Sequence, residues 1–140
     1  MASLHLNNIR KNIEERLIDE FSNVPPLEIV FGNQPFDPSL KKNFIQCLVE
    51  FTDTEYLTQI NTNNFNNLSG LITINIFSKI GVGLGNNLNM AQRIRNLYNR
   101  VKLNDIFFEP SSGPTVINNA APEGYVQTVM SISFDVLESL

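Results

Sequence analysis

The sequence predicts an α+β fold, in which a mostly antiparallel sheet carries two helices packed on one face. Two stretches repeat apolar residues at helical spacing, and several shorter ones alternate apolar and polar residues as strands do. The chain has 140 residues, which suits a single domain spanning residues 1–140. The expected order of elements is a helix, three strands, a second helix and two or three further strands, α-β-β-β-α-β-β(-β).

Two segments have the apolar spacing of amphipathic helices. The first runs over Leu4–Phe21, with Ser3 as its N-cap, and the second over Leu88–Val101, with Asn86 or Asn87 as its cap. Each segment has one apolar stripe and a polar remainder, so each helix is expected to bury one side only. The stripes comprise Leu6, Ile9, Ile13, Leu17 and Phe21 in the first helix and Met90, Ile94, Leu97 and Val101 in the second.

The predicted strands alternate apolar residues with polar ones, which assigns one set to the core. They run over Leu27–Phe31, Phe44–Thr52, Leu71–Ser78, Ile106–Glu109, Thr115–Asn118 and Tyr125–Leu137. The last strand has the longest alternation, and its inward set begins at Val126 and ends at Val136. The opposite set, from Tyr125 to Ser131, is mixed, so the second face of the sheet is expected to be partly exposed or covered by another subunit.

Residues Asp53–Ser69 form a polar, asparagine-rich stretch that is either a long hairpin or an irregular arm. Tyr56, Leu57, Ile60 and Phe65 lie within it, and apolar side chains of this size favour burial. We expect them to pack on a neighbouring subunit or partner, with Tyr56 and Phe65 as anchors. The competing interpretation is that the arm folds back over its own sheet.

Composition excludes several functions. The net charge of −4 argues against tight nucleic-acid binding, which a basic surplus normally supports. Cys47 and His5 are the only cysteine and histidine, so no metal cluster, disulfide or nucleophile–histidine pair is expected. The glycine-rich stretch Gly81–Asn86 lacks the spacing of a phosphate-binding loop. No segment has the length or apolarity of a signal peptide or a membrane span.

The second predicted helix carries arginines that could bind the carboxylates of a partner. Arg93, Asn96 and Arg100 fall along one edge of its polar face. The alternative, a solvated helix surface without a partner, stays open.

Three stretches, spanning nearly the whole chain, have a suggestive order. The first follows the N-terminal helix and includes Phe31–Pro38; the second is Gly70–Phe77 with the glycine-rich turn and helix after it; the third is Gly124–Phe134. In this order and spacing they resemble the tail terminator, or tail-completion, proteins of long-tailed bacteriophages. The chain departs from that family in the second helix, where it has Ala91-Gln92 in place of the common Ala-Asp.

The resemblance implies a structural virion protein that is not an enzyme and needs no cofactor or metal. Such proteins form a ring, typically a hexamer, at the head-proximal end of the tail, after synthesis in the host cytoplasm. The ring caps the tail tube, joins it to a head-completion or stopper protein, and lets DNA pass through its lumen without specific binding; no membrane is involved. The residues expected at subunit or partner interfaces are Pro35, Phe36, Tyr56, Ile60, Phe65, Arg93 and Arg100.

Two alternatives remain at this stage. The first is another neck or minor tail protein, such as a head-closure or stopper protein, which has the same size and charge. The second is a small cytosolic enzyme or ligand-binding domain, which would require a pocket with converging polar groups.

Overall fold

The computed structural model describes residues 6–22, 28–32, 43–56, 65–79, 84–103, 105–117 and 125–139. Two helices and a mostly antiparallel sheet confirm the predicted fold class. In chain order the elements are α1 (Leu6–Phe21), β1 (Glu28–Phe31), β2 (Asn43–Tyr56), β3 (Phe65–Lys79), α2 (Leu84–Tyr98), β4 (Lys102–Leu103), β5 (Ile106–Phe108), β6 (Ser112–Ile117) and β7 (Tyr125–Ser139).

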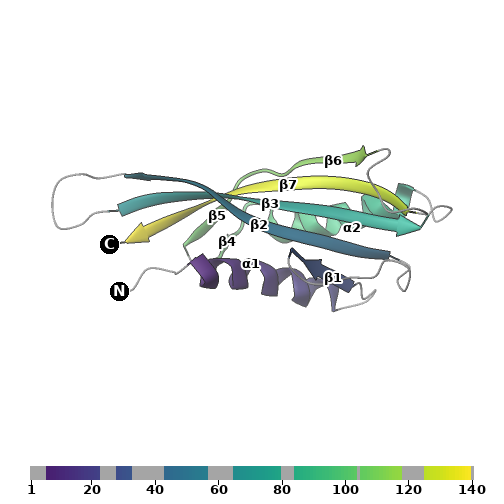
Figure 1. Ribbon diagram of the computed structural model, residues 1–140, viewed down its shortest axis with the longest axis horizontal. Coiled ribbons are helices and arrows are strands. Elements are labelled where there is room, and N and C mark those ends of the chain that lie inside the picture. The colour runs from purple at the N-terminus through teal and green to yellow at the C-terminus, as the bar shows by residue number, and fades with distance from the viewer. Residues whose placement is uncertain are drawn as a thin grey trace.

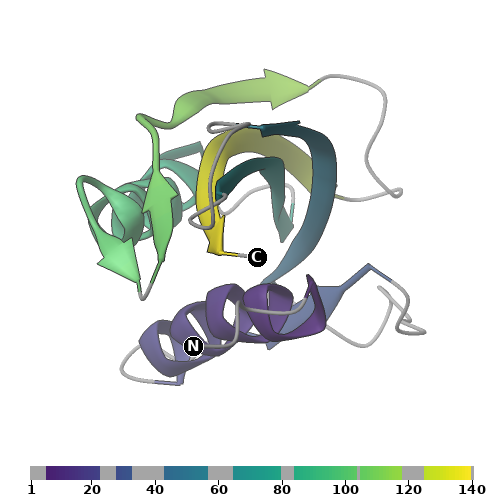
Figure 2. The same ribbon diagram turned by 90° about the vertical axis from the view of Figure 1, so that its left-hand side faces the viewer.

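Three long antiparallel strands, β2, β3 and β7, form the centre of the sheet, whose order is β1-β2-β3-β7-β5-β4. β1 runs parallel to β2, and every other pairing is antiparallel. β5 and β6 follow one another along the same edge of β7. The long strands run the length of the molecule with α1 beside them (Figure 1), and seen end-on they curve over α1 (Figure 2).

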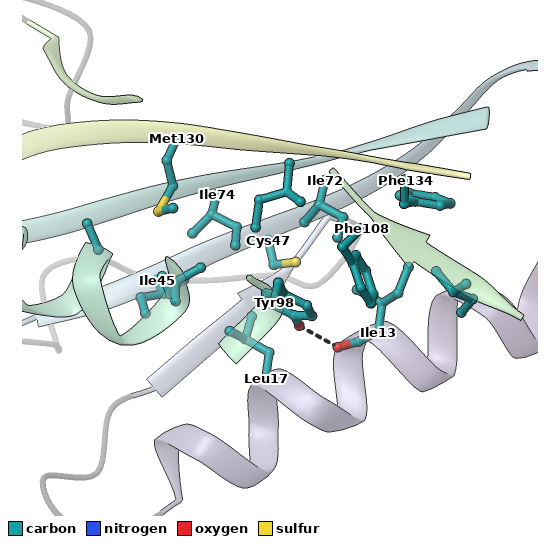
Figure 3. Close-up of a cluster of buried hydrophobic side chains, with 14 of the residues drawn as sticks. Ile13, Leu17, Ile45, Cys47, Ile72, Ile74, Tyr98, Phe108, Met130 and Phe134 are labelled. Atoms are coloured by element: carbon teal, nitrogen blue, oxygen red, sulfur yellow. Dashed lines mark hydrogen bonds between the residues drawn. The ribbon is translucent and has the colours of Figure 1, made fainter. Parts of the chain in front are cut away.

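Both helices pack against one core on the same face of the sheet, as predicted, but Leu6, predicted as part of the first stripe, is exposed at the start of α1. The α1 residues Ile9, Ile13 and Leu17 are wholly buried, because their spacing places them on one side of the helix. Inward side chains of the three long strands complete the core, and Figure 3 shows them between sheet and helices. They include Ile45, Cys47, Ile72, Ile74, Ile76, Met130, Ile132, Phe134 and Val136.

Tyr98 ties the two helices together inside this core. Its ring is buried at the end of α2 and packs against Phe108, with 4.9 Å between ring centroids. Its hydroxyl donates a hydrogen bond of 2.8 Å to the carbonyl oxygen of Ile13 in α1 (Figure 3). Tyr98 was not predicted as a core residue; the predicted stripe ran through Leu97 and Val101, which are only half-buried.

The central strands are longer than predicted. β2 continues past Thr52 to Tyr56, and β3 begins at Phe65 rather than Leu71. Both flanks of the asparagine-rich stretch are therefore paired strands, which corrects the irregular-arm alternative in favour of the hairpin there. Residues 57–64, which include Ile60, lie outside the described residues.

The second helix begins and ends earlier than predicted. It starts at Leu84, so Asn86 and Asn87 lie inside the helix and are not its caps. It ends at Tyr98, and Arg100 follows with a φ of 55°, a left-handed conformation that stops a helix. Ser3, the predicted N-cap of the first helix, lies outside the described residues. So do residues 81–83 of the glycine-rich stretch.

The other face of the sheet has a small apolar cluster at one end. Val30, Phe44 and Phe77 are buried there, and the two phenylalanine rings stack with centroids 4.5 Å apart. A simple two-layer arrangement would leave this face uniformly exposed, but the cluster shows that part of it is buried. Beyond this cluster the described residues of the face are mainly polar.

Candidate interaction surfaces

The face of the sheet opposite the helices is lined by polar side chains in register, and we call it the open face. Gln127 Nε2 donates to Asn75 Oδ1 at 2.8 Å, and Asn75 Nδ2 donates to Gln46 Oε1 at 3.5 Å. Further along, Ser69 Oγ donates to Asp135 Oδ1 at 2.9 Å. These cross-strand bonds hold several polar side chains of the face in place, although Gln127 Oε1 is buried there without a hydrogen-bond partner.

The open face is acidic towards the hairpin. The register places Asp53, Ser69 and Asp135 side by side on β2, β3 and β7, and Glu50 and Glu55 share their face. The sequences of β2 and β7 contain no lysine or arginine. Phosphate groups would be repelled rather than held along these strands.

A groove of about 410 Å³ lies between α1 and the outer edge of β2, just past the end of β1. Its floor includes half-buried Val49, and exposed Leu48 lies at its rim. On the helix side, Arg10 pairs with Glu14, and burial raises the pKa of Glu14 although Arg10 opposes the rise. The complete lining is Arg10, Glu14, Phe31, Gly32, Cys47, Leu48 and Val49.

Of the two arginines expected at an interface, Arg93 contacts residues of α1 in the same chain. Arg93 Nε donates to Glu20 Oε2 at 3.1 Å, and its guanidinium lies 4.2 Å from the centre of the Phe21 ring. These contacts join α2 to α1 within the chain. Arg100 is exposed after the end of α2.

The remaining predicted interface residues belong to strand ends or to the rest of the chain. Tyr56 and Phe65 occupy facing ends of β2 and β3, but their side chains lie outside the described part of the structure. Pro35, Phe36 and Ile60 lie in ranges that the structure does not describe. The structure therefore brings two of these positions to the same end of the hairpin.

The described residues contain no cluster of metal ligands, and the cysteine among them is buried. Cys47 is buried against α1, and burial raises the pKa of its thiol to about 12, so it is not a nucleophile at neutral pH. Among the described residues, no three histidine, cysteine or acidic side chains gather as metal ligands would. A second cavity, between α2 and the segment before β6, measures only about 60 Å³. Neither described helix is long and apolar enough to span a bilayer.

Alkaline pH is expected to destabilise the fold, because burial raises the pKa values of Cys47 and Tyr98. The folded chain then holds these protons more tightly than the unfolded chain. Stability from Cys47 is complete below its ordinary pKa of 9.0 and is lost as the pH rises towards about 12. Urea unfolding should show a loss of up to about 1.4 kcal/mol per pH unit from each group.

The Cys47→Ala variant separates the two contributions. It should be less stable than the native chain at neutral pH, but its stability should fall less steeply above pH 9.0. Equal slopes in the two proteins would show that the thiol does not titrate with unfolding.

Comparison with known proteins supports the fold. No family model matches the chain, and no curated protein matches it. A solved structure whose name is a sequence identifier and states no function matches 95% of this chain and 96% of its own, with a TM-score of 0.70 and 18% identity. At that identity the likeness shows a shared fold alone.

The groove and the outer edge of β2 were not predicted from the sequence. The alternation in β2 predicts which side chains face the core, but it does not predict which strand lies beside it. One signal was available in the sequence: the predicted strand Leu27–Phe31 is short, and a short strand cannot pair with the whole of a longer neighbour.

Proposed function

We propose that this protein is a structural component of a tailed bacteriophage particle, a tail terminator that forms a ring, most simply a hexamer. The ring caps the tail tube, joins it to the head-completion or stopper protein, and works without catalysis. The family resemblance of the sequence motivates the proposal. The structural observation that supports it is the open face, a long ordered surface that the chain's own helices leave uncovered.

The chemistry of the open face suits such a role. Its side chains are held by cross-strand hydrogen bonds, so it can meet a neighbouring protein without first becoming ordered. The carboxylates of Glu50, Asp53 and Asp135, without basic residues on β2 or β7, disfavour retention of DNA. A protein that lets DNA pass must avoid holding its phosphates.

Electron microscopy of the particles produced from the genome that encodes this chain tests the proposal. We expect one ring of this protein between the tail tube and the neck, and tails of uncontrolled length when the gene is deleted. A ring at the head side of the neck would instead assign a head-closure or stopper role. Particles that lack the protein altogether would contradict any virion function.

A further inference from the structure

Among the described residues, half of the outer edge of β2 has no strand beside it. β1 pairs with Phe44–Cys47 only, and within the described residues no strand lies against Leu48–Tyr56 on that side. The N–H of Thr54 donates instead to the carboxylate of Asp53, at 2.9 Å. The groove beside α1 opens onto the start of this unpaired segment. Backbone groups of an exposed edge are ready to pair with another strand.

The opposite side of the sheet has a second unpaired edge. β6 pairs with β7 along one side, and the short strand β4 covers β5 rather than β6. Among the described elements, nothing pairs with the other side of Ser112–Ile117. Pro114 has no N–H, so the donors of this edge are the N–H groups within Thr115–Ile117 that point away from β7.

We propose that Thr115–Ile117 of one copy pair with Leu48–Tyr56 of a second copy, which joins the two sheets edge to edge. The occupant of the β2 edge is thus the same protein, and the contact is heterologous, with different surfaces on the two sides. Repeated contacts of this kind close into a ring. The inference deepens the proposed function and rests on it for the ring itself.

Strand direction agrees with this pairing. β2 and β7 run one way, and β3 and β6 run the other. In a ring whose strands tilt from the axis by well under 90°, every copy has the same polarity. The β6 strand of one copy then meets β2 of the next in antiparallel orientation, as in all neighbouring pairs of the central sheet.

The offset between the two edges also agrees. Val116 lies opposite Thr128 of β7, whereas Val49 lies at the level of Ile132. Pairing Val116 with Val49 offsets neighbouring copies by about 13 Å, taking ~3.3 Å per residue, over four strand spacings that together measure about 19 Å. This offset tilts the strands by about 35°, at the lower end of the ~35–45° of closed sheets.

Charge and side chains favour β6 over a second β2 as the partner. Two β2 edges facing each other would bring Glu50, Asp53 and Glu55 against the same carboxylates, whereas Ser112–Ile117 has no charged residue. Val116 is 39% exposed and faces the helix side of the sheet, because it pairs with buried Thr128. In the proposed pairing it would cover the half-buried core side chains at the β2 edge, among them Val49.

Cross-linking of mixed cysteine variants tests the pairing. Glu50→Cys and Thr115→Cys place single thiols on the open face at the two edges, while the native Cys47 is buried. A short bismaleimide should give cross-linked dimers when the two variants are mixed at high concentration, and not when either is treated alone. Lys11→Cys, on an exposed position of α1, is the matched control and should not link to Thr115→Cys.

Every other result overturns the proposal. Dimers from Glu50→Cys alone would mean that two β2 edges meet, and a mixture without dimers would mean that these edges do not pair. Amide hydrogen exchange on the native chain gives an independent measurement. Exchange across Leu48–Tyr56 should be slower at high protein concentration than at low concentration. Unchanged exchange there would contradict the pairing. It would not contradict the proposed function, which electron microscopy of the particles tests separately.

Discussion

Replacing Gly70 by alanine is expected to lower the free energy of unfolding by about 3 kcal/mol, at the upper end for overpacking. Gly70 lies in β3, and the ring of Phe134 packs directly over it. A Cβ there would overlap Phe134 Cζ and would lie 2.7 Å from the carbonyl oxygen of Glu50. The ring is wholly buried and also meets Phe51 edge-on, so it has no room to move away.

Gly85→Ala is the matched control for this substitution. Gly85 lies in α2, and nothing comes within 4 Å of the position of its Cβ. Alanine should therefore stabilise the chain slightly, by about 0.5 kcal/mol, through its helix propensity. Urea unfolding followed by circular dichroism measures both variants. A Gly70→Ala variant as stable as Gly85→Ala would show that the core adapts around Phe134.

The periodicity of apolar residues was enough to predict the fold class and the core. Each element buries one face, and this places its apolar residues at regular spacing. The stripe from Ile9 to Phe21 and the alternation from Thr128 to Val136 are both buried as that argument requires. These elements each bury one side against the other layer, so spacing alone identifies the buried set. Pairing partners follow no such local rule.

The ends of the long strands were missed because strand pairing overrides local preference. Asn66 and Asn67 are poor strand formers, yet both belong to β3. Asn67 Nδ2 donates to Asp135 on β7 at 3.3 Å, a bond that exists only once the strands have paired. Composition pointed to an irregular segment there, whereas the neighbouring strands extend the hairpin.

The candidate surfaces were less predictable than the fold. Arg93 has the spacing of an exposed helical residue, but α1 supplies Glu20 and Phe21 as its partners from a distant part of the sequence. The open edge of β2 depends on where β1 stops along it. Both features follow from the packing of separate elements, which no single segment encodes.

Replacing Asn87 by leucine should also cost about 3 kcal/mol, because it removes the centre of a buried polar network. Asn87 is wholly buried in the first turns of α2. Its Oδ1 accepts a hydrogen bond from Ser78 of β3, and its Nδ2 donates to Thr128 Oγ1 of β7 at 3.0 Å. The same Nδ2 lies 3.3 Å from the carbonyl oxygen of Val126. Leucine would remove these bonds and leave Ser78 Oγ with only the 3.2 Å hydrogen bond from Asn86 Nδ2.

Asn89→Leu makes the same chemical change on the exposed side of the same helix. It should leave the free energy of unfolding within about 0.5 kcal/mol of the native value, since leucine is the better helix former. The difference between the two variants therefore isolates the network from helix propensity. Equal stability in Asn87→Leu and Asn89→Leu would mean that the hydroxyl of Thr128 finds another partner and that α2 is held on the sheet without the bonds of Asn87.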